Sequence, residues 1–156
     1  MSNIPTSYKY SDAFGVPAFA VLDTYTQQNL LAGAEPPLRP ANRVLLADSL
    51  TLAQFTVVGL TAAGKLTPAV YNATLASATV PIGVLVHAAT SGATNTTIFG
   101  EVWLSGCFNA GIDDTGADSP LIWDASFTTL ALKTQWVGLI GKPGLVFRSG
   151  RGGNAS

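Results

Sequence analysis

The sequence contains few charged residues. Lys, Arg, Asp and Glu make up 11% of its 156 residues, against about 25% in an average globular domain. None of them occurs between Leu66 and Gly100. The formal net charge is −1, and no stretch is basic enough to predict direct binding to nucleic acid. Because a surface so poor in charge favours association, we expect a protein that packs against copies of itself or against another protein.

Cysteine and long apolar runs are also scarce. Cys107 is the one cysteine, so an intrachain disulfide is excluded, as is typical of a reducing compartment or of an assembly without crosslinks. The apolar runs are far shorter than the roughly 20 residues that cross a bilayer. The first residues contain no apolar segment of the kind found in signal peptides. We therefore expect neither a membrane segment nor an export signal.

The composition divides the chain into four regions. Residues 1–19 predict an extended N-terminal arm, in which prolines exclude a continuous helix and spaced aromatic residues alternate with small polar ones. Residues 20–43 predict an irregular, Pro-rich segment. Residues 44–150 predict one folded domain with a single core, and residues 151–156 predict a flexible tail.

Short strands dominate the pattern of the predicted domain. Residues 80–88 and 97–105 are two apolar, β-branched runs joined by a loop of small residues, and we expect them to pair as an antiparallel hairpin. The preceding segment "TAAGKL" predicts a turn at Gly64, and "GLVFR" predicts a last strand. Residues 126–138 are the best candidate for a helix, which Ser126 would cap and Gly138 would end.

The chain's histidine and cysteine invite a reading as a catalytic pair. A Cys–His nucleophile needs the imidazole within hydrogen-bonding reach of the thiol. No nucleophile motif surrounds Cys107, and His87 ends an apolar strand. We expect Cys107 to be a small buried apolar side chain and His87 to face solvent or a neighbouring subunit. A small hydrolase that uses both residues and an acid is an alternative, which the position of the two side chains tests.

The remaining reactive groups form no recognisable constellation. Asp113, Asp114 and Asp118 lack the alternation and the final glutamate of an EF-hand calcium loop, so we expect a solvated loop with Asx turns. Glu101 lies within a predicted strand and has no specified carboxylate partner. Lys65 follows Gly64, but the first glycine and the hydroxyl residue of a Walker loop are absent. We expect no enzyme, no metal and no cofactor.

Three short motifs follow one another between residues 55 and 109: "FTVVGLTAAGKLTP", "IGVL" and "EVWLSGCFN". In their order and spacing they resemble the head decoration proteins of lambda-type bacteriophages. The residues shared with the family pattern are Gly59, Gly64, Lys65, Gly83, Gly106 and Phe108. The resemblance covers under half of the chain, and the segments 20–43 and 110–150 are longer than the family pattern has.

The resemblance implies a fold and a function. The fold would be α+β and β-rich: a small, compact β-barrel or β-tulip-like domain of short strands with one or two short helices. The protein would be a homotrimer on the outer surface of the expanded phage capsid, made in the host cytoplasm. It would bridge major capsid protein subunits and stabilise the shell against the pressure of the packaged DNA. Neither nucleic acid nor a membrane would be a direct partner.

The N-terminal arm would add a strand to the capsid protein, as the resemblance implies, with backbone hydrogen bonds supplying the affinity. The arm itself matches no family motif. From the spacing of its large apolar side chains we infer that Ile4, Tyr8, Tyr10 and Phe14 contact the capsid.

A second reading is a binding module displayed on the virion for a carbohydrate or a host surface. Its support is Trp103, Trp123 and Trp136, provided that these side chains are exposed. Tryptophans are more often packing or interface anchors, so burial of all three would weaken this reading.

Overall fold

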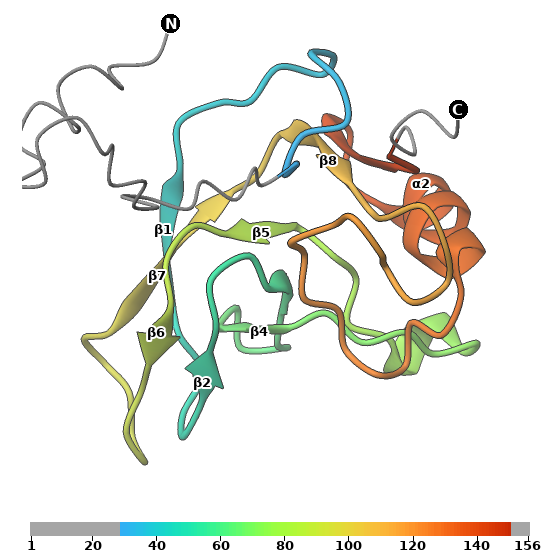
Figure 1. Ribbon diagram of the computed structural model, residues 1–156. Coiled ribbons are helices and arrows are strands. Elements are labelled where there is room, and N and C mark those ends of the chain that lie inside the picture. Colours follow the sequence, from blue (N-terminus) through green and yellow to red (C-terminus); the bar gives the residue numbers. More distant parts are fainter. Residues whose placement is uncertain (1–28, 151–156) are drawn as a thin grey trace, which may run out of the picture.

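The computed structural model describes residues 29–150. This part of the chain is rich in strands and poor in helix (Figure 1). It is a β-rich α+β domain, as the sequence predicts. The predicted arm, residues 1–19, and the predicted tail, residues 151–156, lie outside the described residues.

An antiparallel sheet forms the framework. Its five strands run in the order β1-β7-β5-β3-β4. Their bounds are Asn42–Leu45 for β1, Phe99–Trp103 for β7, Gly83–Leu85 for β5, Val57–Leu60 for β3 and Leu66–Pro68 for β4. In the β5–β7 pair Val84 lies opposite Trp103 and Leu85 opposite Val102. This pairing confirms the predicted hairpin between residues 80–88 and 97–105.

The predicted turn in "TAAGKL" is the tight connection between β3 and β4. Gly64 donates its N–H to the Thr61 carbonyl at 2.9 Å, and Thr61 donates to the Lys65 carbonyl at 2.8 Å. Gly64 has a φ of 76°, a conformation that glycine adopts without steric cost. The predicted turn is confirmed, and the positive φ at its position 64 explains why a glycine stands there.

The central strands bury both of their faces. Successive side chains of a strand point to opposite sides of the sheet. Val57 and Val84 enter a first hydrophobic core, which also contains Phe108, Phe127 and Phe147. The next residue of each strand enters a second core, whose buried members are Leu46, Leu52, Val58, Leu66, Leu85 and Val102. The domain therefore has two cores, one on each side of β3 and β5, and the prediction of a single core is wrong.

The sheet curls around the second core without closing into a barrel. Its two edge strands approach each other at a single parallel bridge between Leu46 and Leu66, where the Ala47 N–H donates to the Leu66 carbonyl at 2.9 Å. The chain then turns at Asp48 and Ser49, which ends the contact after one bridge. The expectation of a barrel is therefore wrong, because β1 leads into a turn instead of continuing alongside β4.

A separate two-stranded sheet covers the first core. β8 (Gly106–Asn109) pairs in parallel with β9 (Leu145–Arg148). The described N-terminal residues add to its free edge: Ala32 donates to the Cys107 carbonyl, and Asn109 donates to the Leu30 carbonyl, both at 2.9 Å. The sequence predicts β9 correctly but not β8 as a strand of its own. A third, very short pair joins β2 (Thr51–Leu52) to β6 (Ala89–Thr90).

The predicted helix over residues 126–138 is confirmed in part. Residues 130–140 are helical, with a π-helical stretch η2 (Leu132–Trp136) followed by α2 (Val137–Ile140). A short 3-10 turn, η1 (Leu75–Ser77), lies beyond β4. Figure 1 shows α2 at one side of the molecule, beside the strands of the β8–β9 sheet.

Both predicted ends of that helix are wrong. Thr129 stands before the first turn, and its Oγ1 accepts the Leu132 N–H at 3.3 Å. Ser126 lies further back and accepts the Tyr71 N–H at 2.9 Å instead. Gly138 stays inside the helix, which ends at Ile140 and has Gly141 as its C-cap.

The Pro-rich segment is irregular where it is described. Residues 29–41 contain one isolated bridge, between Leu31 and Phe108. β1 begins at Asn42, just inside the predicted segment 20–43. Among residues 29–150 no helix is long and apolar enough to cross a membrane.

We predict that Gly83→Ala destabilises the domain by about 2–3 kcal/mol, as overpacking of a rigid site does. A Cβ at this position would lie 2.3 Å from the Trp103 carbonyl oxygen and 2.5 Å from Val102 Cγ1. Chemical denaturation measures the loss. Gly92→Ala is the control, because no atom lies within 4 Å of a Cβ there, and it should stay within about 0.5 kcal/mol of the parent. Equal effects of the two substitutions would refute the packing argument.

Candidate interaction surface

Large apolar side chains reach the surface on several elements. Among residues 29–150, those at least two-fifths exposed are Leu31, Leu38, Leu60, Leu75, Ile98, Phe99, Ile112, Ile122 and Leu139. The most exposed is Leu139, at 85%, on α2. Single exposed apolar side chains are normal, but here they share the surface with few charges. Such an exterior can be covered by another protein at little cost in desolvation.

The segment without charges contributes a continuous stretch of this surface. Residues 72–77, which include η1, are all exposed, and Leu75 is the largest of them at 56% exposure. The absence of charge in the sequence between Leu66 and Gly100 is thus a property of the exterior as well as of the buried strands.

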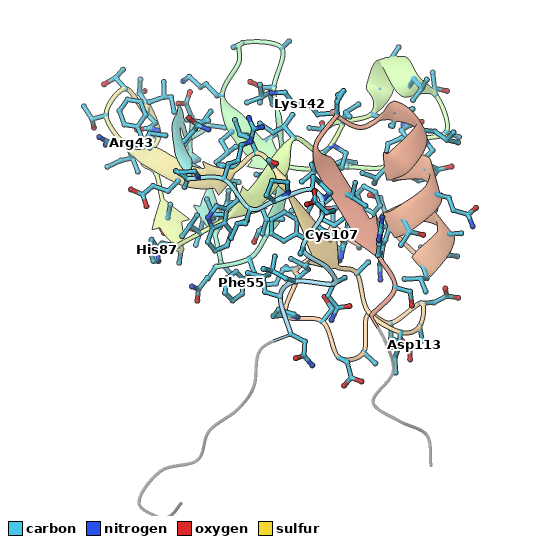
Figure 2. All side chains as sticks on the ribbon, turned by 90° about the horizontal axis from the view of Figure 1, so that it is seen from above. Arg43, Phe55, His87, Cys107, Asp113 and Lys142 are labelled. Carbon is cyan, nitrogen blue, oxygen red and sulfur yellow. The ribbon has the colours of Figure 1, made fainter. Side chains whose placement is uncertain are left out.

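His87 and Cys107 do not form a catalytic pair. Cys107 is fully buried on β8, where Gly33 of the N-terminal segment covers its sulfur. His87 is exposed beyond β5, and Figure 2 shows the two residues apart. The cysteine is the small buried side chain that the sequence predicts. The alternative of a hydrolase built on these two residues is wrong, because the thiol meets neither the imidazole nor solvent.

The acidic segment is a turn that its own side chains organise. Asp113 Oδ1 accepts the Thr115 hydroxyl at 2.6 Å and the Ala117 N–H at 3.1 Å. These hydrogen bonds, that from Thr115 foremost, lower the pKa of Asp113 below its ordinary value. The predicted solvated loop is confirmed, since Asp113 is exposed, but its backbone hydrogen bond goes to Ala117, four residues on, and not two residues on as in an Asx turn. Among residues 29–150 no three His, Cys, Asp or Glu side chains cluster in a way that could hold a metal ion.

The three tryptophans pack against the first core. Trp103 stacks on Phe55 with ring centroids 6.4 Å apart. Trp123 contacts Phe127 at 4.9 Å, and Trp136 contacts Phe127 at 5.9 Å. All three are partly buried. A sugar-binding platform needs an open aromatic face, so the reading as a carbohydrate-binding module loses its main support.

The residues shared with the decoration-protein pattern occupy structural positions. A Cβ at Gly59 would lie 2.5 Å from the Val80 carbonyl oxygen. Gly106 has a φ of 150° where the chain passes from β7 to β8, and Phe108 is fully buried in the first core. Gly83 lies at the β5–β7 contact described above. The inferred capsid contacts lie outside the described residues; they are Ile4, Tyr8, Tyr10 and Phe14.

Lys65 joins loops that are distant in the sequence. Its Nζ contacts Asp48 Oδ1 at 2.8 Å, the one ion pair among residues 29–150, and donates to the Asn95 carbonyl at 3.3 Å. The hydrogen bond from Lys65, followed by that from the Asn95 N–H, lowers the pKa of Asp48. Asn95 in turn donates to the carbonyls of Leu46 and Ile98. This network holds the end of β1 against the loop between β6 and β7.

Asn109 likewise connects segments that are distant in the sequence, at the end of β8. It is 3% exposed, and its Nδ2 donates to the Asn29 carbonyl at 2.8 Å and to the Asp118 carbonyl at 2.7 Å. Its Oδ1 accepts the Gly111 N–H. The first described residue of the chain is thereby tied to the acidic turn. Sequence reasoning missed Asn95 and Asn109 as hubs, because an isolated asparagine after a strand signals only a turn.

Several open cavities indent the surface. One of about 270 Å³ is lined by Arg43, His87, Phe99 and Glu101, among others, and Arg43 lies over the Phe99 ring at 4.9 Å. Another, of about 360 Å³, lies between the Pro-rich segment and the turn before β9. Neither contains an arrangement of nucleophile, base and oxyanion donors that would indicate catalysis.

No family model matches the chain, and no curated protein matches it significantly.

We predict that Asp48→Asn lowers the free energy of unfolding at neutral pH. The variant should also lose less of this free energy than the parent when the pH falls. The folded pKa of Asp48 is below its ordinary value of 3.8, so its contribution is present above that value and is lost as the pH falls further. Urea denaturation at about pH 7 and about pH 2.5 measures this difference. The gap between parent and variant should narrow at the lower pH; a gap that stays constant would contradict the assignment. Asn keeps the acceptor for the Asn95 N–H, so the comparison isolates the charge.

Proposed function

We propose that the chain is a structural virion protein that binds the outer surface of the expanded phage capsid. It bridges neighbouring major capsid protein subunits, associates as a homotrimer and stabilises the shell against the pressure of packaged DNA. The proposal starts from the resemblance of residues 55–109 to the head decoration proteins of lambda-type phages.

The observation that carries the proposal is that the resembling motifs form one physical unit. β3, β4, β5 and β7 are all strands of the same sheet, and β8 follows directly after β7. Gly59 and Gly83 lie where a Cβ would collide with a neighbouring backbone. The order and spacing of the motifs therefore have a steric cause, which supports the resemblance beyond a chance match of short apolar strings.

The low charge of the exterior suits a protein that packs closely beside copies of itself on a capsid. Copies that tile a shell would repel one another if each had a large charge of one sign, and this chain has a net charge of −1. Exposed leucines such as Leu75 and Leu139 supply apolar area for contacts with neighbouring proteins. The gain in buried interface would provide the mechanical reinforcement.

The attachment point of the arm also supports the proposal. Residue 29, the first described residue, is fixed beside Asn109 at the end of β8, and 28 residues precede it in the sequence. A chain of this length can span up to about 90 Å when it is fully extended. The apolar side chains at Ile4, Tyr8, Tyr10 and Phe14 would occupy pockets of the capsid protein while the arm adds a strand to it.

We predict that the purified protein binds expanded, undecorated capsids in a fixed stoichiometry and raises the temperature at which they are disrupted. Capsids of the phage that encodes the chain are the substrate, and unexpanded shells are the control. Cosedimentation gives the number of copies bound, and calorimetry gives the disruption temperature. Absence of binding, or binding without a change in disruption temperature, would exclude a stabilising role.

We predict that deletion of residues 1–19 weakens capsid binding at least tenfold and leaves the denaturation curve of the domain unchanged. The reason is that the arm would supply backbone hydrogen bonds only to the partner. The double substitution Tyr8→Ala/Tyr10→Ala should reproduce part of the loss, since large aromatic anchors dominate interfaces. Undiminished binding of the truncated chain would rule out the arm as a contact.

A further inference from the structure

The cavity beside the Pro-rich segment is positively charged. Arg39 and Lys142 line this cavity of about 360 Å³, together with Leu104 and Ser105, and no carboxylate does. We call it the basic pocket. Its volume is within the range of sites that hold a ligand or a few partner side chains. In a chain with so few charges, two cations at one opening are a local concentration of positive potential.

Hydrogen bonds between its walls hold the basic pocket open. The Ser105 hydroxyl donates to the Pro37 carbonyl at 2.9 Å, which ties the Pro-rich segment to the β7–β8 connection. The Gly106 N–H donates to the Gly144 carbonyl at 2.8 Å, which ties the turn before β9 to the same place. Prolines in the wall have a fixed φ and little freedom to collapse. The pocket is therefore formed before any partner arrives.

The two cations have no partner within the described part of the chain. The half-buried Lys65 and the buried Lys133 do have partners: Lys65 pairs with Asp48, and Lys133 donates to the Asp114 carbonyl at 2.8 Å. Between residues 29 and 150 neither Arg39 nor Lys142 forms an ion pair or a side-chain hydrogen bond of this kind, and both are exposed. Their charges are available to another molecule.

Residues 112–118 carry the complementary charge, and we call them the acidic loop. Asp113, Asp114 and Asp118 are all exposed. Asp114 Oδ1 accepts the Leu130 N–H at 2.7 Å, which together with the hydrogen bonds to Asp113 Oδ1 fixes the loop. The buried Lys133 donates to the Asp114 backbone carbonyl and forms no ion pair with the three carboxylates. A fixed loop loses little conformational freedom on docking.

The basic pocket and the acidic loop cannot meet within one molecule. Figure 2 shows Lys142 and Asp113 on different sides of the domain. We propose that the acidic loop of one copy of this chain docks against the basic pocket of a second copy. Each charged surface is then paired by a neighbour, and Ile112 and Leu38, each 40% exposed, provide apolar area beside the charges.

This contact is heterologous, because two different surfaces of the same chain meet. Repeated from copy to copy, such a contact makes a ring when the rotation closes and an open chain when it does not. The inference deepens the self-association that the proposed function includes and rests on it. It names the residues that would join neighbouring copies, whereas capsid binding depends on the arm.

A double-mutant cycle tests the contact. Arg39→Gln/Lys142→Gln removes the charges of the basic pocket. Asp113→Asn/Asp114→Asn/Asp118→Asn removes those of the acidic loop and keeps the side-chain oxygens that organise it. Asn also tolerates the positive φ of 61° at position 118. Arg43→Gln/Glu101→Gln is the control, because these exposed residues line a different cavity. Sedimentation equilibrium of the full chain from about 1 µM to about 1 mM measures self-association.

Each of the two test variants should weaken self-association about tenfold, and the control less than about twofold. The combined variant should also be about tenfold weaker than the parent, because removal of one surface already removes the interaction. Association of the parent should weaken at high salt, and that of the combined variant should depend less on salt.

Three results would overturn the inference: losses that multiply to about a hundredfold in the combined variant, losses no larger than the control's, or a parent that is monomeric throughout the range. The capsid-binding assay reports separately on the proposed function. A chain that binds capsids but does not self-associate through these residues refutes only the docking inference. A chain that associates as described but ignores capsids refutes only the capsid role.

Discussion

The close backbone contact between β5 and β7 at Gly83 is the constraint on which the domain depends. Because a glycine stands there, the Trp103 carbonyl can approach the Gly83 backbone more closely than any Cβ would allow. The next two residues of β5 then point to opposite sides: Val84 into the first core and Leu85 into the second. Packing around both cores follows from this strand. Gly100 allows a similarly close approach where the sheet curls around the second core, because a Cβ there would meet Leu66 and Leu85.

Most of the lysines and aspartates named above connect segments that are distant in the sequence. Lys65 and Asp48 secure the end of β1 against the loop before β7, Lys133 and Asp114 join the helix to the acidic loop, and Asp113 shapes that loop. These lysines and aspartates thus stabilise the fold by holding distant loops together. Arg39 and Lys142 have no such role among residues 29–150 and line the same pocket, which is why we propose them for an intermolecular contact. On a surface otherwise made of small and apolar residues, a few unpaired charges decide orientation more than affinity.

Local signals account for what could be predicted. The β3–β4 turn was predictable because Gly64 supplies the positive φ that the turn requires. The β5–β7 hairpin was predictable because its strands are near in sequence. β8 was missed, because its partner β9 lies far along the chain and parallel pairing has no turn signal. The sequence places the helix start at Ser126, whereas the structure has it at Thr129. Both residues have a hydroxyl group that could cap the helix, and only a tertiary contact, from the Tyr71 N–H to Ser126, decides between them. The polar hubs Asn95 and Asn109 were missed for the same reason: their partners come from distant segments.

By itself the sequence determined that the domain would be β-rich, poor in charge and built on glycines at close strand contacts, since composition, period-two alternation and turn residues act locally. It also determined that Cys107 would be a buried apolar side chain. Only the tertiary structure decided that the sheet curls without closing, because a single bridge between Leu46 and Leu66 is followed by a turn. It alone brought Arg39 and Lys142 to one opening and placed Asp113 on another side. Such placements depend on pairings between remote segments, and no local pattern of residues encodes them.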